Sequence, residues 1–113
     1  MMDWNGYREA LLARVGDLGR LTPETLKGLT TLDRAGEKND HLGAKTRELI
    51  ALAVAVTTRC DGCIAVHSKA ALELGASRDE IAEALGVAVA LNAGAAVTYS
   101  ARVLDAVEAL PES

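Results

Sequence analysis

The sequence has few aromatic residues and no excess of positive charge. Its 113 residues include no Phe, one Trp and two Tyr, and the formal net charge at pH 7 is −4. Proteins that bind nucleic acids present basic surfaces, and those that bind single strands add aromatic side chains on which the bases stack. The composition therefore predicts a protein without a nucleic-acid partner.

Long apolar runs are also scarce. Residues 1–19 mix charged and apolar side chains, whereas a secretory signal needs a continuous apolar segment. The longest stretches with almost no charge are residues 49–58 and 85–101. The first is too short to cross a bilayer, and polar residues such as Asn92 and Ser100 interrupt the second before it reaches the roughly 18 apolar residues of a span. We therefore expect a soluble, cytoplasmic protein with no membrane partner.

What the sequence does contain is small apolar side chains. Half of the residues are apolar, mostly Ala, Val, Leu and Ile. The length suits one domain, so we predict a single domain over residues 1–113. Because side chains of this size bury little area each, we expect part of the apolar surface to be buried against other copies of the chain.

Apolar residues recur at helical spacing, and no stretch alternates convincingly as a strand would. Helix starts are indicated by Thr22, which precedes a proline, and by Ser77 followed three residues later by Glu80, a capping box. The pattern predicts an all-α fold of five to seven helices. The helices are expected near residues 4–18, 23–35, 44–58, 60–74, 78–91 and 95–110.

Three helix boundaries are predicted from residues that disfavour helix. The second helix is expected to stop at Gly36. The chain is expected to turn at Gly62, between the two cysteines, so that the cysteine pair lies at the N-terminus of a central helix. The segment Asn92–Gly94 is expected to kink or break the helix that contains it.

The candidate chemistry is concentrated in residues 59–69, which hold both cysteines and one of the two histidines. At about 100° per residue, one helix would place Cys60, Cys63 and His67 on a single face. Residues three apart on a helix lie roughly 5–6 Å apart, within the reach of a disulfide. The start of a helix stabilises a thiolate, and His67 can exchange a proton near neutral pH. These groups suit thiol–disulfide exchange or peroxide reduction.

The residues alone leave other interpretations of the cysteine pair open. A structural zinc site takes four ligands, which would be Cys60, Cys63, His67 and either His41 or Glu48, although a second cysteine pair is missing. Two other interpretations are disfavoured, because a thioredoxin-like site needs a preceding strand, which the pattern does not predict, and haem attachment needs a histidine directly after the second cysteine, where this chain has Ile64. A further interpretation is a pair of buried cysteines without a role.

Read with the preceding helix, the pattern becomes Glu48-x11-Cys60-x2-Cys63-x3-His67. Over roughly residues 42–104 the sequence resembles the carboxymuconolactone decarboxylase superfamily, on its AhpD-like branch of alkyl hydroperoxidase-related proteins. The resemblance implies an all-α domain that assembles as a homo-oligomer. It also implies that Cys63 attacks a peroxide, that Cys60 resolves the product as a disulfide, and that His67 and Glu48 relay protons. We expect neither a metal nor a cofactor.

The resemblance therefore predicts a thiol-dependent oxidoreductase that reduces hydroperoxides or disulfides, with a small hydroperoxide as substrate and an external thiol as reductant. One alternative is an enzyme like the lactone decarboxylases, a branch that lacks the cysteine pair. Another is a non-enzymatic redox sensor or oligomeric interaction module. Some relatives carry a His where this chain has Gly62, so the relay is expected to be shorter. His41 is expected in an exposed loop, and residues 1–41 are expected to serve packing or assembly.

Overall fold

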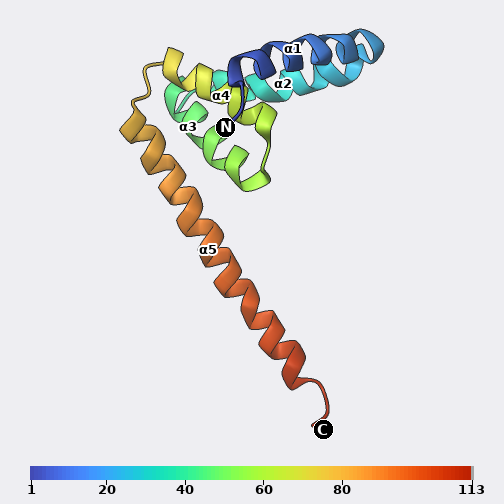
Figure 1. The fold of residues 1–113 in the computed structure, drawn as a ribbon, viewed down its shortest axis with the longest axis vertical. Helices are drawn as coiled ribbons and strands as arrows, with labels where there is room; N and C mark the ends of the chain where they lie inside the picture. The colour runs from blue at the N-terminus through green and yellow to red at the C-terminus, as the bar shows by residue number, and fades with distance from the viewer. Residues whose placement is uncertain (113) are drawn as a thin grey trace.

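The computed structural model describes residues 1–112 and is built from helices (Figure 1). Within those residues there are five helices and no strand. The predicted all-α fold is confirmed, at the lower end of the expected number of helices. The helices are α1 (Trp4–Leu21), α2 (Pro23–Asn39), α3 (Ala44–Thr58), α4 (Asp61–Glu73) and α5 (Arg78–Glu108).

Helices α3 and α4 form a hairpin, and α5 packs against α3 (Figure 1). The chain reverses at Arg59, whose backbone is left-handed with φ 56°. The backbone N–H groups of Arg59 and Cys60 both donate to the carbonyl of Ala55, which satisfies an end of α3 and offsets the cost of the left-handed residue. The expected turn at Gly62 is therefore wrong, because Gly62 lies inside the first turn of α4.

Helices α1 and α2 form a second hairpin that lies across the first, with α1 against α4 (Figure 1). Helix α2 continues past its expected stop at Gly36 and ends at Asn39. Gly36 instead permits a close approach, since a Cβ there would lie 2.7 Å from Cδ of Arg47 on α3. The Arg47 guanidinium donates to the Gly36 carbonyl at 3.3 Å and to Asp40 at 2.9 Å. These contacts connect α2 to α3.

Helix α5 begins at the capping box that the sequence predicts. The N–H of Glu80 donates to the hydroxyl of Ser77 at 3.0 Å, and the N–H of Ser77 donates to the Glu80 carboxylate at 2.9 Å. Lys45 on α3 donates to the same carboxylate at 2.8 Å. Glu80 therefore holds the start of α5 against α3 and helps to set the direction of the long helix.

The expected kink or break at Asn92–Gly94 is wrong, because α5 continues through this segment to Glu108. The side-chain amide of Asn92 donates to the carbonyl of Ala88 at 2.7 Å and to the hydroxyl of Thr57 on α3 at 2.8 Å. A glycine inside a helix costs only about 1 kcal/mol relative to alanine, which a long helix tolerates. The two expected helices, 78–91 and 95–110, are one helix.

The second half of α5 extends away from the other four helices (Figure 1). All residues from 89 to 112 are exposed. The described chain therefore leaves a long apolar helix surface without a partner. The buried apolar residues are Leu52, Ala55, Ala65, Ala71, Ala76 and Ala88, whereas the large apolar side chains exposed on the distal part of α5 include Val97, Tyr99, Val103, Leu104 and Val107.

Helix α5 is also long and apolar enough, by length and composition, to cross a membrane. This differs from the expectation that polar residues between 85 and 101 would disqualify the stretch. A single helix that meets this criterion is weak evidence for a membrane span, since the criterion uses length and composition only.

The contacts of Glu80 predict how stability depends on pH. The hydrogen bond from Lys45, followed by that from the Ser77 backbone, lowers the pKa of Glu80 below its ordinary value of 4.5. The folded protein therefore binds this proton less tightly than the unfolded chain. The stabilisation is present above the ordinary pKa and is lost as the pH falls through the lowered one.

The free energy of unfolding is measured by urea titration at several pH values. When the pH is lowered from about 6 to about 3, this free energy should therefore fall less in Glu80→Gln than in the wild type. Glu83→Gln, at an exposed position on the same helix, is the matched control and should keep the wild-type dependence. The same pH dependence in Glu80→Gln and the wild type would contradict the role assigned to Glu80.

Candidate active site

The two cysteines form a disulfide in the first turn of α4, with their Cα atoms 5.2 Å apart. Cys60 is the residue that caps the helix, and its Sγ accepts a hydrogen bond from the Cys63 backbone N–H at 3.1 Å. The cysteine pair therefore lies at the N-terminus of α4, as predicted. The free N–H groups and the dipole of a helix start stabilise negative charge on sulfur, so this position favours a thiolate once the disulfide is reduced.

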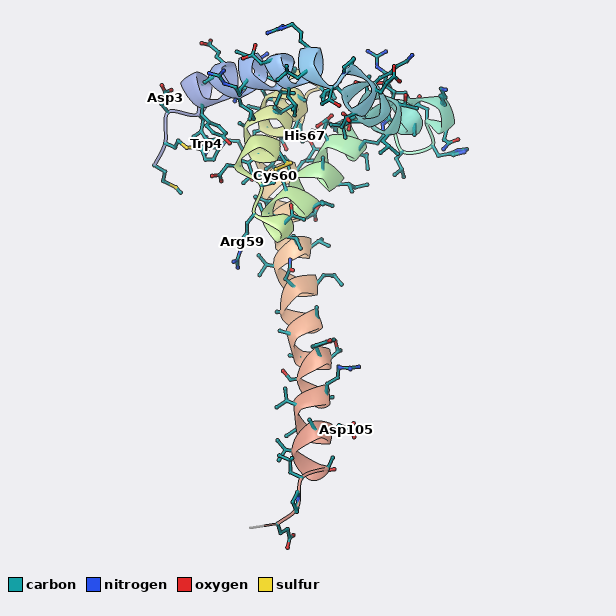
Figure 2. The ribbon with its side chains drawn as sticks, turned by 90° about the vertical axis from the view of Figure 1, so that its right-hand side faces the viewer. Asp3, Trp4, Arg59, Cys60, His67 and Asp105 are labelled. Atoms are coloured by element: carbon teal, nitrogen blue, oxygen red, sulfur yellow. A yellow bond between two sulfur atoms is a disulfide. The ribbon has the colours of Figure 1, made fainter. Side chains whose placement is uncertain are left out.

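His67 lies on α4 one turn after Cys63, the spacing that makes two side chains neighbours on a helix surface. Its Nδ1 is 2.6 Å from a carboxylate oxygen of Glu48 on α3. Cys60 precedes the first residue of α4 and His67 lies about two turns further along, so both belong to the hairpin of α3 and α4 (Figure 2). An ionised carboxylate only accepts hydrogen bonds, so with Glu48 in that form Nδ1 is the donor of this bond. In a neutral ring this leaves Nε2 as the nitrogen that can accept a proton.

The hairpin formed by α3 and α4 explains why Glu48 and His67 meet although they are 19 residues apart in the sequence. Glu48 lies about three turns before Arg59 and His67 about two turns after it, at 3.6 residues per turn. The two helices run in opposite directions from the turn at Arg59, so the two side chains reach similar levels. Glu48 is 23% exposed and His67 is 32% exposed, so solvent-borne molecules can reach a pair that is mostly covered by protein.

The structure brings together the four residues that the sequence singled out, as two bonded pairs in one hairpin. Cys60 is joined to Cys63, and Glu48 is hydrogen-bonded to His67. His41 lies in an exposed loop between α2 and α3, as expected. Within residues 1–112, no three His, Cys, Asp or Glu side chains are grouped in a way that could hold a metal ion.

Helix α1 contributes contacts to the site that the sequence did not indicate. Leu11 packs against Gly62, such that a Cβ on Gly62 would lie 2.8 Å from a methyl carbon of Leu11. Arg8 donates from Nε to the carbonyl of Ala65 at 2.6 Å. A side chain at position 62 would therefore meet Leu11. Residues so distant in sequence carry no local signal of such a contact.

Comparison with known proteins gives consistent matches over most of the chain. Residues 23–106 match the carboxymuconolactone decarboxylase family. An uncharacterised protein of Haemophilus influenzae is 50% identical over 104 residues, which cover 92% of each chain. An uncharacterised protein of Cupriavidus necator is 32% identical over 95 residues, or 84% of each chain. The crystal structure of an apo carboxymuconolactone decarboxylase family protein from Legionella pneumophila aligns with a TM-score of 0.74 and 35% identity, over 93% of this chain and 94% of that one.

The contact between Leu11 and Gly62 predicts an unusual response to alanine. In an open helical position, glycine to alanine stabilises by up to about 1 kcal/mol. Gly62→Ala should stabilise the protein less than the same substitution does at an open position, or destabilise it, because the Leu11 side chain must shift to admit the new methyl group. Gly28→Ala on α2 is the matched control, since a Cβ there meets nothing within 4 Å.

Adding Leu11→Ala should remove part of the penalty. In a double-mutant cycle measured by urea unfolding, the two substitutions should show a favourable coupling of at least about 0.5 kcal/mol. If Gly62→Ala stabilised the protein as much as Gly28→Ala did, the close contact would be refuted.

Proposed function

The chain belongs to the carboxymuconolactone decarboxylase family, and from this premise we propose that it is a thiol-dependent oxidoreductase of the AhpD-like branch. The proposed substrate is a hydroperoxide, and the electrons come from an external thiol. The observation that carries the proposal is the disulfide at the start of α4, one turn from a histidine that is hydrogen-bonded to a carboxylate. Because the two cysteines form their disulfide within the folded hairpin, an external thiol can reduce this disulfide and it can form again in each catalytic cycle.

The proposed reaction has three steps. The thiolate of Cys63 attacks the terminal oxygen of the hydroperoxide, the O–O bond breaks, and the alkoxide takes up a proton and leaves as an alcohol. The sulfenic acid on Cys63 is then attacked by the sulfur of Cys60, which forms the disulfide and releases water. An external dithiol finally reduces the disulfide to two thiols and is itself oxidised to a disulfide.

His67 and Glu48 supply proton transfer in this scheme. The Nε2 atom of neutral His67 takes a proton from a thiol and returns it to the leaving oxygen. Glu48 holds the ring in the tautomer that leaves Nε2 free, and its negative charge stabilises the imidazolium that forms during transfer. Positioned acid–base groups of this kind typically contribute about 10²–10⁴ in rate.

Two other functions are distinguishable from this one. A reaction like that of the lactone decarboxylases would not use the sulfur atoms and should survive replacement of both cysteines. A redox sensor would change its assembly on oxidation but would show negligible turnover. The reducible pair beside an acid–base pair favours catalysis, because a sensor needs no proton relay to form a disulfide slowly.

The proposal predicts that peroxide turnover depends on Cys63. With cumene hydroperoxide and a dithiol reductant, Cys63→Ser should lower kcat/KM by at least about a hundredfold, because the attacking and oxidised atom is lost. Circular dichroism of the reduced proteins should show unchanged helix content. Cys60→Ser should still consume about one equivalent of peroxide in a single turnover. Wild-type activity in Cys63→Ser would exclude this mechanism.

We further propose that the protein is a soluble, cytoplasmic homo-oligomer assembled through α5. The exposed apolar side chains of the distal half of α5 have no partner in the described chain. A second apolar surface lies where α3 meets the first half of α5, with a cavity of about 410 Å³. Its lining residues are Ile50, Ala53, Val54, Thr57, Val87, Ala88, Leu91 and Asn92. Two unpartnered apolar surfaces on one chain suit burial against a second copy.

If the protein assembles through α5, a charged residue introduced on the apolar side of this helix should disrupt the oligomer, whereas one on its polar side should not. Leu104 is 67% exposed on the apolar side, whereas Thr98, Arg102 and Asp105 follow helical spacing on a polar side. Light scattering of the wild type should give a multiple of the chain mass of 11.8 kDa. Leu104→Asp should shift the protein towards the single chain, and the control Thr98→Asp should leave the assembly intact. A wild type that is monomeric at micromolar concentration would rule the assembly out.

A further inference from the structure

A cavity of about 330 Å³ lies between α1 and α4, outside the four residues of the candidate site. Trp4 and Arg8 line it from α1, and Ile64, Ala65 and Ser68 line it from α4. Ile64 and Ser68 directly follow Cys63 and His67 in the sequence. One residue advances the helix surface by about 100°, so the cavity lies on the face of α4 next to the one that carries the thiols and the imidazole.

Arg8 is the charged group of this cavity, and it is half-buried. Its Nε donates to the Ala65 carbonyl at 2.6 Å, and its Nη1 donates to the side-chain oxygen of Asn5 at 2.9 Å. Among residues 1–112, no carboxylate forms an ion pair with Arg8, whereas Arg47, the other half-buried arginine, is paired with Asp40 at 2.9 Å. A half-buried guanidinium held by neutral groups keeps an uncompensated charge and several unused N–H donors.

The remaining residues that line the cavity indicate which kind of anionic ligand could pair with Arg8. Trp4 lies at the start of α1 beside α4 (Figure 2) and supplies an aromatic surface, to which Ile64 adds an aliphatic one. The hydroxyl of Ser68 has no hydrogen-bond partner within the described part of the chain. The cavity therefore combines a cationic group, a free hydroxyl and an apolar wall. A guanidinium matches a carboxylate in shape and charge, and the apolar wall matches a hydrocarbon or aryl body.

We propose that this cavity binds the carboxylate of the substrate, and that the substrate class is an organic hydroperoxide bearing a carboxylate on an apolar body. Arg8 and Ser68 hold the carboxylate, and the apolar body lies along α4 towards the cysteine pair. The binding site stands on the cavity itself. The assignment of its ligand as a substrate rests on the proposed function.

Binding is testable without turnover, because Trp4 is the single tryptophan and lines the cavity. Titration with octanoate, which is optically transparent, should change the Trp4 fluorescence saturably. 1-Octanol, which has the same chain length without the charge, should bind at least about tenfold more weakly. The absence of a saturable change with octanoate, or equal binding of the two compounds, would overturn the proposal.

Variants identify the residues that hold the carboxylate. Arg8→Gln should weaken octanoate binding at least about tenfold, because it removes a charge-assisted hydrogen bond. The matched control is Arg14→Gln, whose guanidinium lies on the surface of α1 with the side chain 86% exposed. Ser68→Ala, which leaves the contact between Arg8 and Ala65 in place, should weaken octanoate binding a few-fold and so tests the site even if Arg8→Gln does not fold. Wild-type affinity in both Arg8→Gln and Ser68→Ala would overturn the site.

The substrate role is tested with a matched pair of hydroperoxides, cumene hydroperoxide and its para-carboxylate derivative. Arg8→Gln should raise KM for the carboxylated compound about tenfold, with kcat and the neutral substrate little affected. An equal effect on both substrates would mean that Arg8 only attaches α1 to α4, and would overturn the substrate role. If the wild type turned over neither compound, the proposed function would fail, whereas the octanoate titration would still decide the binding site.

Discussion

The hydrogen bond between Glu48 and His67 is the interaction on which the candidate site depends. It joins α3 to α4 beside the cysteine pair, and it determines which ring nitrogen of His67 is free. A hydrogen bond to a charged group contributes about 1.5–3 kcal/mol when its partners are largely shielded from water. The bond requires the hairpin to reverse at Arg59, since a shift of one residue there would turn His67 by about 100° away from Glu48.

A second constraint comes from the shortage of large apolar side chains in the core. The buried residues are mostly alanines, which let α3, α4 and α5 approach closely but bury little area. Larger apolar side chains are instead exposed on several helices, including the distal half of α5. In the assembly proposed above, the chain gains stability by sharing α5 with another copy, and α5 packs against α3 of the hairpin that holds the candidate site.

The sequence predicted the all-α fold, whereas three of the predicted helix boundaries were wrong. Helical periodicity, the capping box at Ser77 and the spacing from Glu48 to His67 are local signals, and the structure brings the four site residues together. The stop at Gly36 and the break at Asn92–Gly94 were wrong because glycine and asparagine weaken a helix by amounts that tertiary contacts offset. The contact of Leu11 with Gly62 was not predictable, since it joins helices whose packing no local pattern encodes.

The central claim, that Cys60 and Cys63 are the redox-active atoms, is tested most directly by stoichiometric oxidation. Fully reduced protein is treated with one equivalent of cumene hydroperoxide, its free thiols are counted, and the peptide that contains both cysteines is weighed by mass spectrometry. We expect both thiols to disappear, the peptide to lose two hydrogen atoms, and one equivalent of cumyl alcohol to form. Persistence of both thiols while the peroxide is consumed would contradict the assignment.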